Sequence, residues 1–145
     1  MKQTMQRDLI LRVVSKVLIP YIFLFALYVQ FHGDYGPGGG FQAGVIFASG
    51  IILYALVFGL RRAQATFNPR WVEIFCALGV LLFGGVGIWS LFQHGNFLDY
   101  NVLNHHDPKH GQHLGILLIE LGVGIAVTAA MVSIFFTFTG RGRSA

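Results

Sequence analysis

The chain contains four long stretches of sequence that are almost free of charge. They cover residues 17–31, 41–60, 74–92 and 114–139, and the only charged residue inside them is Glu120. An α-helix rises about 1.5 Å per residue, so about 20 residues cross the roughly 30 Å of hydrocarbon in a bilayer. The first stretch reaches this length when the apolar residues 9–14 before it are included. We therefore predict one all-α membrane domain over residues 1–145, with four transmembrane helices at about 9–31, 41–60, 72–92 and 114–139.

The composition excludes the other fold classes. Hydrophobic residues make up 54% of the chain and charged residues only 11%, whereas a soluble domain typically has about 25% charged residues. Such a chain cannot cover a water-facing surface with charge. A transmembrane barrel would instead alternate polar and apolar residues over segments of about 10 residues, a pattern that these long apolar stretches lack.

Basic residues lie almost entirely on one side of the predicted spans. The two outer loops, residues 32–40 and 93–113, contain a single basic residue, Lys109. The other nine are Lys2, Arg7, Arg12, Lys16, Arg61, Arg62, Arg70, Arg141 and Arg143. The positive-inside rule therefore predicts that both termini are cytoplasmic. The same asymmetry explains the basic pI, so we expect the lipid bilayer as a partner and no nucleic acid.

The first outer loop is rich in glycine and leads into the second predicted helix. It lacks the Lys-Ser/Thr pair of a phosphate-binding loop and no strand precedes it, so we interpret it as a tight turn between antiparallel helices. Pro37 cannot continue the first helix. Beyond the turn, Gly40, Gly44 and Ala48 recur every four residues on one helix face.

Small residues on one face allow two helices to approach closely in a membrane. The third predicted helix contains Gly79, Gly84, Gly85 and Gly87, and the fourth contains Gly122, Ala126 and Ala130. Four helices do not need so many contact faces to pack with one another. We therefore expect some of these faces to receive another membrane subunit, with packing inside the chain as the alternative.

The second outer loop contains a cluster of histidines. His105, His106, His110 and His113 lie within nine residues, together with Asp107, and such side chains can bind a transition metal. Their spacing matches no recognised metal site. The alternative is a polar loop in which Asp107 and Pro108 form a turn or begin a helix. We therefore predict neither metal nor cofactor, and these four histidines are the only weak candidate ligands.

Glu120 is an acid inside the fourth predicted helix. Counted from His113, it lies seven residues into the span, about 10 Å below that end. An acid at the bilayer centre costs roughly 2.5–3.5 kcal/mol on insertion scales, and such residues commonly mark an ion or proton path. Alternatively, a protonated Glu120 hydrogen-bonds between helices or reaches the outer interface. His32 and Asp34, in the first outer loop, are the other candidates for an ion or proton path.

Several of these motifs together resemble a known family. Gly33, the run Pro37-Gly38-Gly39-Gly40-Phe41 and Gly44 open an uncharged helix, and Glu120 is followed by Leu121-Gly122-Val123. With four spans and the basic loop at 61–70, the chain resembles the B-type subunits of the multisubunit Mrp-type Na⁺/H⁺ antiporter family over essentially its whole length. The glycines, Pro37 and Phe41 are the structural motif of this resemblance.

The resemblance implies a transporter subunit rather than an enzyme. Such a chain would belong to a hetero-oligomeric cation/proton antiporter in a prokaryotic plasma membrane, where it would support sodium tolerance and pH homeostasis. Its partners would be the other membrane subunits, and the complex would carry Na⁺ and H⁺. Two alternatives stay open: a homologous subunit of an ion-pumping hydrogenase or oxidoreductase, and a stand-alone metal-binding membrane protein that uses the histidine-rich loop.

Overall fold

The computed structural model describes residues 2–33, 37–103 and 108–141, and the described part of the chain contains helices and no strand. The long helices are α1 (Lys2–His32), α2 (Gly40–Phe58), α4 (Pro69–Phe92) and α5 (Pro108–Arg141). A short helix α3 (Leu60–Thr66) and a 3₁₀ helix η1 (Tyr100–Leu103) lie in the connections. Each long helix contains an apolar segment that is long enough to cross a membrane. The predicted all-α fold with four transmembrane helices is confirmed.

The helices extend beyond the apolar stretches that predict them. α1 begins at Lys2 and α5 at Pro108, whereas the apolar stretches begin near residues 9 and 114. Hydrophobicity marks the part of a helix that lies in hydrocarbon, and a helix that enters water can continue with polar residues. Proline suits the first turn of α5 because that position needs no N–H donor inside the helix. The connection after α2 also contains α3, which begins after Gly59 turns the chain with φ 95°.

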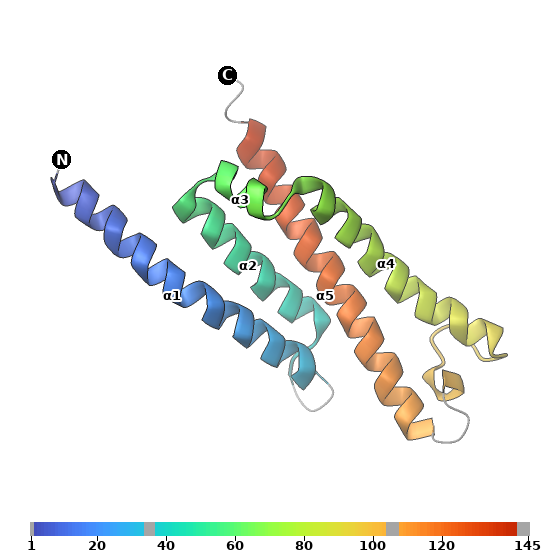
Figure 1. Ribbon diagram of the computed structural model, residues 1–145. Coiled ribbons are helices and arrows are strands. Elements are labelled where there is room, and N and C mark those ends of the chain that lie inside the picture. Colours follow the sequence, from blue (N-terminus) through green and yellow to red (C-terminus); the bar gives the residue numbers. More distant parts are fainter. Residues whose placement is uncertain (1, 34–36, 104–107, 142–145) are drawn as a thin grey trace.

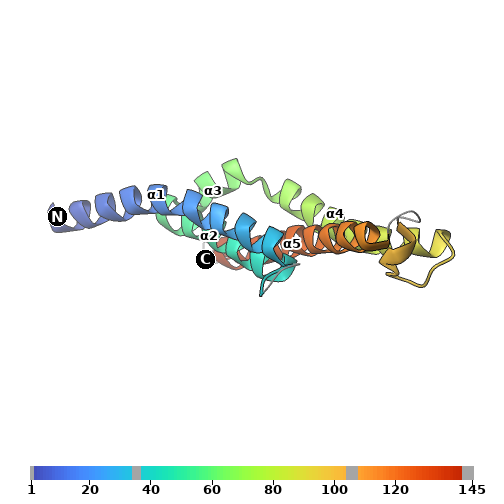
Figure 2. The same ribbon diagram turned by 90° about the horizontal axis from the view of Figure 1, so that it is seen from below.

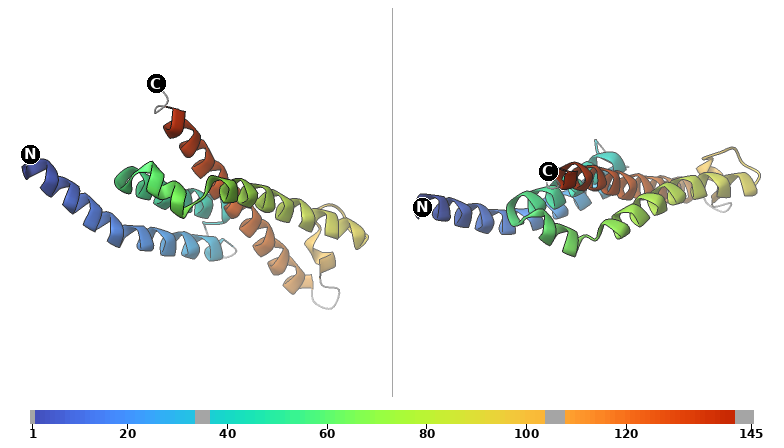
Figure 3. Two further views of the ribbon diagram at one scale, coloured as in Figure 1. Left: turned by 45° about the horizontal axis from the view of Figure 1, so that its top comes forward. Right: turned by 90° about the horizontal axis from the view of Figure 1, so that it is seen from above.

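The four long helices form a single layer (Figures 1 and 2). α5 lies between α2 and α4 and packs against both, and α1 packs against the far side of α2. The order across the layer is therefore α1, α2, α5, α4. The first turn of α1, the last turn of α5 and the short α3 lie at one end of the layer (Figures 1 and 3).

The two hairpins reach different heights in the layer. α1 ends and α2 begins beside Glu120, which lies well inside α5. From Pro108 to Ile119, α5 continues beyond this point for about 18 Å and packs there against α4 and η1. Gly115 provides the space for the Tyr100 ring, and the Gln112 side-chain amide donates a 2.9 Å hydrogen bond to Asn101 Oδ1. η1 thus braces the outer part of the α4–α5 hairpin.

Most of the small-residue faces are used inside the chain. A Cβ on Gly44 would lie 2.8 Å from the Gly124 carbonyl oxygen, and one on Gly79 would lie 2.6 Å from the Gly122 carbonyl oxygen. Ala48 is buried in the core. These contacts join α2 and α4 to α5, so the expectation that these faces receive another subunit is wrong for them. Among the glycines of α4, only Gly84 and Gly85 would place a Cβ in open space.

The hydrophobic core lies toward the end of the layer that carries α3. Its buried residues are Ala48, Ile51, Ala55, Leu60, Ala63, Val132 and Phe136. They come from α2, α3 and α5, so α3 closes the gap between these helices. Asn68 then starts α4 by accepting a 3.0 Å hydrogen bond from the Arg70 N–H, with Pro69 in the first turn.

Candidate functional site

The glycine-rich turn folds back onto the end of α1. The Gly39 N–H donates a 3.2 Å hydrogen bond to the Val29 carbonyl oxygen, and the Gly39 carbonyl oxygen accepts a 3.1 Å bond from Ala43 N–H in α2. Gly39 has φ 121°, a backbone conformation that side chains with a Cβ rarely adopt. A Cβ on Gly38 would lie 2.8 Å from the same Val29 oxygen. The motif glycines are therefore required by the backbone path of the turn.

The carboxyl group of Glu120 occupies the space that these glycines leave. A Cβ on Gly33 would clash with the Glu120 carboxylate, and a Cβ on Gly39 would lie 3.0 Å from Glu120 Oε1. A Cβ on Gly40 would clash with the Glu120 backbone carbonyl. Two helices and their turn thus close around one half-buried acidic residue.

Two glutamines from the first hairpin lie near the contact between the glycine turn and α5. Gln30 of α1 is 6% exposed, and its Oε1 lies 2.6 Å from the position of a Cβ on Gly124, one helical turn from Glu120. Gln42 of α2 places its Oε1 within 3.9 Å of the position of a Gly39 Cβ, the same position that Glu120 approaches. We call the set of Glu120, Gln30, Gln42, Gly33, Gly39 and Gly40 the Glu120 site.

Sequence reasoning missed both glutamines, although a signal existed. Each is a polar residue in or beside a stretch that is otherwise apolar, and a polar group in a membrane interior needs a partner. Thr128 gives the same signal: its hydroxyl lies 2.7 Å from the Gly124 carbonyl oxygen and 3.1 Å from that of Gly44. Thr128 therefore places a polar side chain at the contact between α2 and α5.

Glu120 lies about 18 Å along α5 from Pro108, where the helix begins. The apolar stretch begins only near residue 114, so the depth of about 10 Å below the end of the span stays a prediction. Glu120 lies level with the turn between α1 and α2. Backbone groups of the turn can therefore reach an acid that the sequence places among apolar neighbours.

The other two candidates for an ion or proton path are His32 and Asp34. His32 is the last residue of α1, and its ring stacks on Tyr28 with 5.0 Å between the ring centroids. It directly precedes Gly33, which contacts Glu120. Asp34 lies outside the described residues.

Of the remaining motif residues, one is buried in a helix contact and two are exposed. Gly44 is buried against α5, whereas Pro37 is exposed and Phe41 is 64% exposed. Phe41 therefore does not contribute to the helix contact that the adjacent glycines make.

The histidine-rich loop is described only in part. His110 and His113 are exposed in the first turns of α5, while His105 and His106 lie outside the described residues. Within residues 2–33, 37–103 and 108–141, no three His, Cys, Asp or Glu side chains gather as metal ligands would. The four-histidine site therefore stays an untested hypothesis.

Comparison with known proteins identifies the family. Residues 10–133 match the family MnhB, described as "Domain related to MnhB subunit of Na+/H+ antiporter". Relatives called "Putative antiporter subunit mnhB2" from Staphylococcus aureus strains Newman, JH1 and COL are each 33% identical over 141 residues, which cover 96% of this chain and 99% of the relative. The family match includes the glycine turn, Glu120, and all or most of each of the four apolar helix segments. The chain therefore belongs to the family of domains related to the MnhB subunit of Na⁺/H⁺ antiporters.

Proposed function

We propose that this chain is an integral membrane subunit of a multisubunit Na⁺/H⁺ antiporter in the prokaryotic plasma membrane. The proposal is supported by the family match over most of the chain and by four helices of membrane-spanning length. Both termini lie on the cytoplasmic side, as the distribution of basic residues indicates. The alternative, a subunit of an ion-pumping hydrogenase or oxidoreductase, is not favoured by these comparisons.

The single helical layer is the observation that supports a role as a subunit. Secondary transporters commonly enclose a midplane site between repeats that move against one another. Here α1, α2, α5 and α4 lie side by side (Figure 2), and no second layer covers either broad face in the described part of the chain. Large apolar side chains are exposed along all four helices. Lipid and other membrane subunits cover these faces in the assembled complex.

The Glu120 site supports a direct contribution to transport. A carboxyl group can bind and release a proton, and ionisable residues in transporter helices commonly act as proton relays. The side-chain oxygens of Gln30 and Gln42 lie close to the same turn, and oxygen atoms are the ligands that hard cations accept. The site therefore provides one binding position on a proton or cation path, at the end of the α1–α2 hairpin that contains the glycine turn.

Copurification tests the assignment as a subunit. A tagged copy of the full chain, extracted in mild detergent, should bring down other polytopic antiporter subunits. Recovery of the chain alone or as a homo-oligomer contradicts the proposal. Recovery with iron–sulfur or nickel-site proteins would support the hydrogenase or oxidoreductase alternative instead.

Replacing the carboxyl group tests the transport role. Glu120→Gln keeps the size of the side chain and cannot exchange a proton, so we expect intact assembly and lowered Na⁺-dependent proton exchange. The measurement is the Na⁺-induced collapse of a pH gradient in everted membrane vesicles, over a range of pH. Glu73→Gln is the matched control, since Glu73 is exposed on α4, several turns from the Glu120 site. Exchange equal to wild type at every pH in Glu120→Gln would remove Glu120 from the path.

The metal-binding alternative has its own test. Joint replacement of His105, His106, His110 and His113 by Gln should leave metal content and exchange unchanged if the loop has no metal role. A metal that copurifies with the wild-type chain and is lost from the variant would establish the site.

A further inference from the structure

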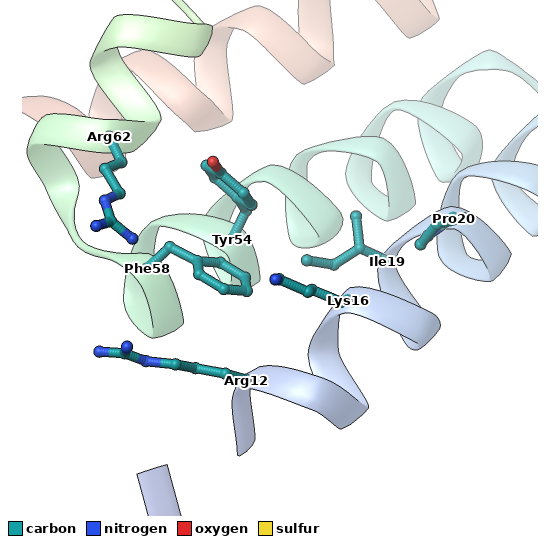
Figure 4. A pocket seen from close by; sticks show the side chains of 7 residues that line it. All are labelled: Arg12, Lys16, Ile19, Pro20, Tyr54, Phe58 and Arg62. Atoms are coloured by element: carbon teal, nitrogen blue, oxygen red, sulfur yellow. The ribbon is translucent and has the colours of Figure 1, made fainter. Parts of the chain in front are cut away.

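A basic pocket lies between α1, α2 and α3, at the opposite end of the first hairpin from the Glu120 site. It has a volume of about 460 Å³ and is lined by Arg12, Lys16, Ile19, Pro20, Tyr54, Phe58 and Arg62. Arg12 and Lys16 are on α1 and Arg62 is on α3. Figure 4 shows their side chains directed toward a shared space beside Phe58.

The charges in this pocket are unbalanced. Arg12, Lys16 and Arg62 contribute three positive charges, and no carboxylate of a described residue lines the pocket. Asp8, four residues before Arg12, has a side chain outside the described residues. Even if Asp8 paired with Arg12, the remaining net charge would be +2, the three cations minus one acid. Like charges that converge in one pocket are stabilised by an anion.

The distance of the pocket from the glycine turn matches the thickness of the hydrocarbon layer. Measured along α1 from His32 at the turn, Lys16 is about 24 Å away and Arg12 about 30 Å away. Since the hydrocarbon layer is about 30 Å thick, the cations lie where lipid headgroups begin if the glycine turn is at the other boundary. Tyr54 suits this level because tyrosine favours the membrane–water interface.

We propose that this pocket binds a phosphate group, either that of an anionic phospholipid headgroup or that of a free phosphate anion. Guanidinium groups bind phosphate oxygens through paired N–H donors, and basic pockets between transmembrane helices bind anionic headgroups. Ile19, Pro20 and Phe58 give the pocket an apolar side, which suits the glycerol and acyl carbons of a lipid. The ligand would join α1 to α3 across the end of α2.

A pair of double variants tests the proposal in the full chain. Arg12→Gln with Arg62→Gln removes two cations from the pocket. Arg61→Gln with Arg70→Gln removes the same charge from neighbouring positions that do not line it. All four side chains are exposed, so neither variant disturbs the helix packing. Arg12→Lys with Arg62→Lys keeps the charge and should retain binding.

The lipid source is measured in nanodiscs that contain phosphatidylglycerol in a phosphatidylcholine background. Native mass spectrometry should detect phosphatidylglycerol retained by the wild type and by the Arg61/Arg70 control, and at least about tenfold less in the Arg12/Arg62 variant, since each basic residue near the surface attracts anionic lipid. The soluble source is measured in phosphatidylcholine alone. There, inorganic phosphate should raise the melting temperature of the wild type and not that of the Arg12/Arg62 variant.

Either result supports the phosphate pocket and identifies its source. Equal retention of phosphatidylglycerol by the two double variants, with no effect of inorganic phosphate, overturns the proposal. So does equal retention of phosphatidylglycerol and phosphatidylcholine by the wild type without a phosphate effect. A variant that keeps its lipid but loses copurifying subunits would assign the pocket to an acidic protein segment, which also overturns it.

Discussion

At the residue scale, the absence of a side chain at Gly33 sets the position of the Glu120 carboxyl group. A Cβ there would clash with the end of a flexible side chain and not with the backbone. The carboxyl group can move aside, so a small substitution at Gly33 displaces the functional group and leaves the helices in place. A substitution at Gly33 can therefore change the position of the Glu120 carboxyl group without changing the stability of the helix packing.

We expect Gly33→Ala to lower Na⁺-dependent proton exchange and to leave assembly intact. The Glu120 side chain must shift, whereas the backbone contacts of α2 and α5 stay as they are. The measurement is exchange in everted vesicles beside the yield of the copurified complex. Gly84→Ala is the control, because a Cβ on Gly84 meets nothing within 4 Å. Normal exchange in Gly33→Ala would show that the carboxyl position does not limit transport.

At Gly40, seven residues after Gly33, we expect a substitution to lower stability instead of displacing only the carboxyl group. A Cβ at Gly40 would clash with the backbone of Glu120, which cannot move without separating α2 from α5. Gly40→Ala should therefore cost about 1–3 kcal/mol of stability, as overpacking in a protein core does. Detergent-induced unfolding of the purified chain, followed by circular dichroism, measures this loss. Unfolding at the wild-type detergent concentration would contradict the close α2–α5 contact.

At the element scale, α5 holds the molecule together because both α2 and α4 pack against it. Each contact depends on glycine: Gly44 beside the Gly124 carbonyl oxygen in one, and Gly79 beside the Gly122 carbonyl oxygen in the other. Helices associate in lipid through close packing and interhelical hydrogen bonds rather than by leaving water. The small residues therefore set the helix order.

We expect Gly79→Ala to loosen the α4–α5 hairpin and Gly84→Ala to be tolerated. Both changes add one methyl group to the same helix and favour its helical state by up to about 1 kcal/mol. Only Gly79 faces backbone atoms, at 2.6 Å from its Cβ position. Protease accessibility of the loop between α4 and α5 reports on the hairpin. Equal cleavage of the two variants would place the α4–α5 contact elsewhere.

The sequence predicts the apolar segments because lipid imposes their length. It does not predict where α1 and α5 begin, since polar residues can extend a helix into water. The sequence also cannot show whether a face of small residues packs inside the chain or lies on its surface. Gly79 and Gly84 are both glycines of the third apolar stretch, and only the structure shows that Gly79 faces the backbone of α5 whereas Gly84 faces open space. Glu120 is identifiable as an acid in an apolar stretch, whereas its enclosure by Gly33 and Gly39 depends on the relative height of two hairpins.

At the scale of the whole molecule, the chain is a thin layer with α3 and both terminal helix turns at one end (Figure 3). Arg61, Arg62 and Arg70, in α3 and in the first turn of α4, lie at that end, and the connection from α4 to η1 lies at the other. From this distribution of charge we propose that the end with α3 and the terminal helix turns faces the cytoplasm.

Cysteine labelling in intact cells tests this orientation. In a Cys76→Ser background, which removes the only native thiol, a cysteine at Gln64 should be protected from an impermeant maleimide and one at Asn96 should react. Both positions lie outside the helix contacts of the Glu120 site, so they leave that site unchanged. Labelling of both positions, or of neither, in cells that are labelled normally after permeabilisation would contradict four alternating crossings.

The unequal reach of the two hairpins has a consequence for any neighbouring subunit. The first turns of α5 extend beyond the shorter α1–α2 hairpin, so the glycine turn lies beside the middle of α5 and not beside its end. A neighbouring subunit that packed against these first turns of α5 would enclose a space above the glycine turn. Water in this space would reach the Glu120 carboxyl group without crossing lipid, and the depth of the space would depend on the offset between the two hairpins instead of on any single side chain.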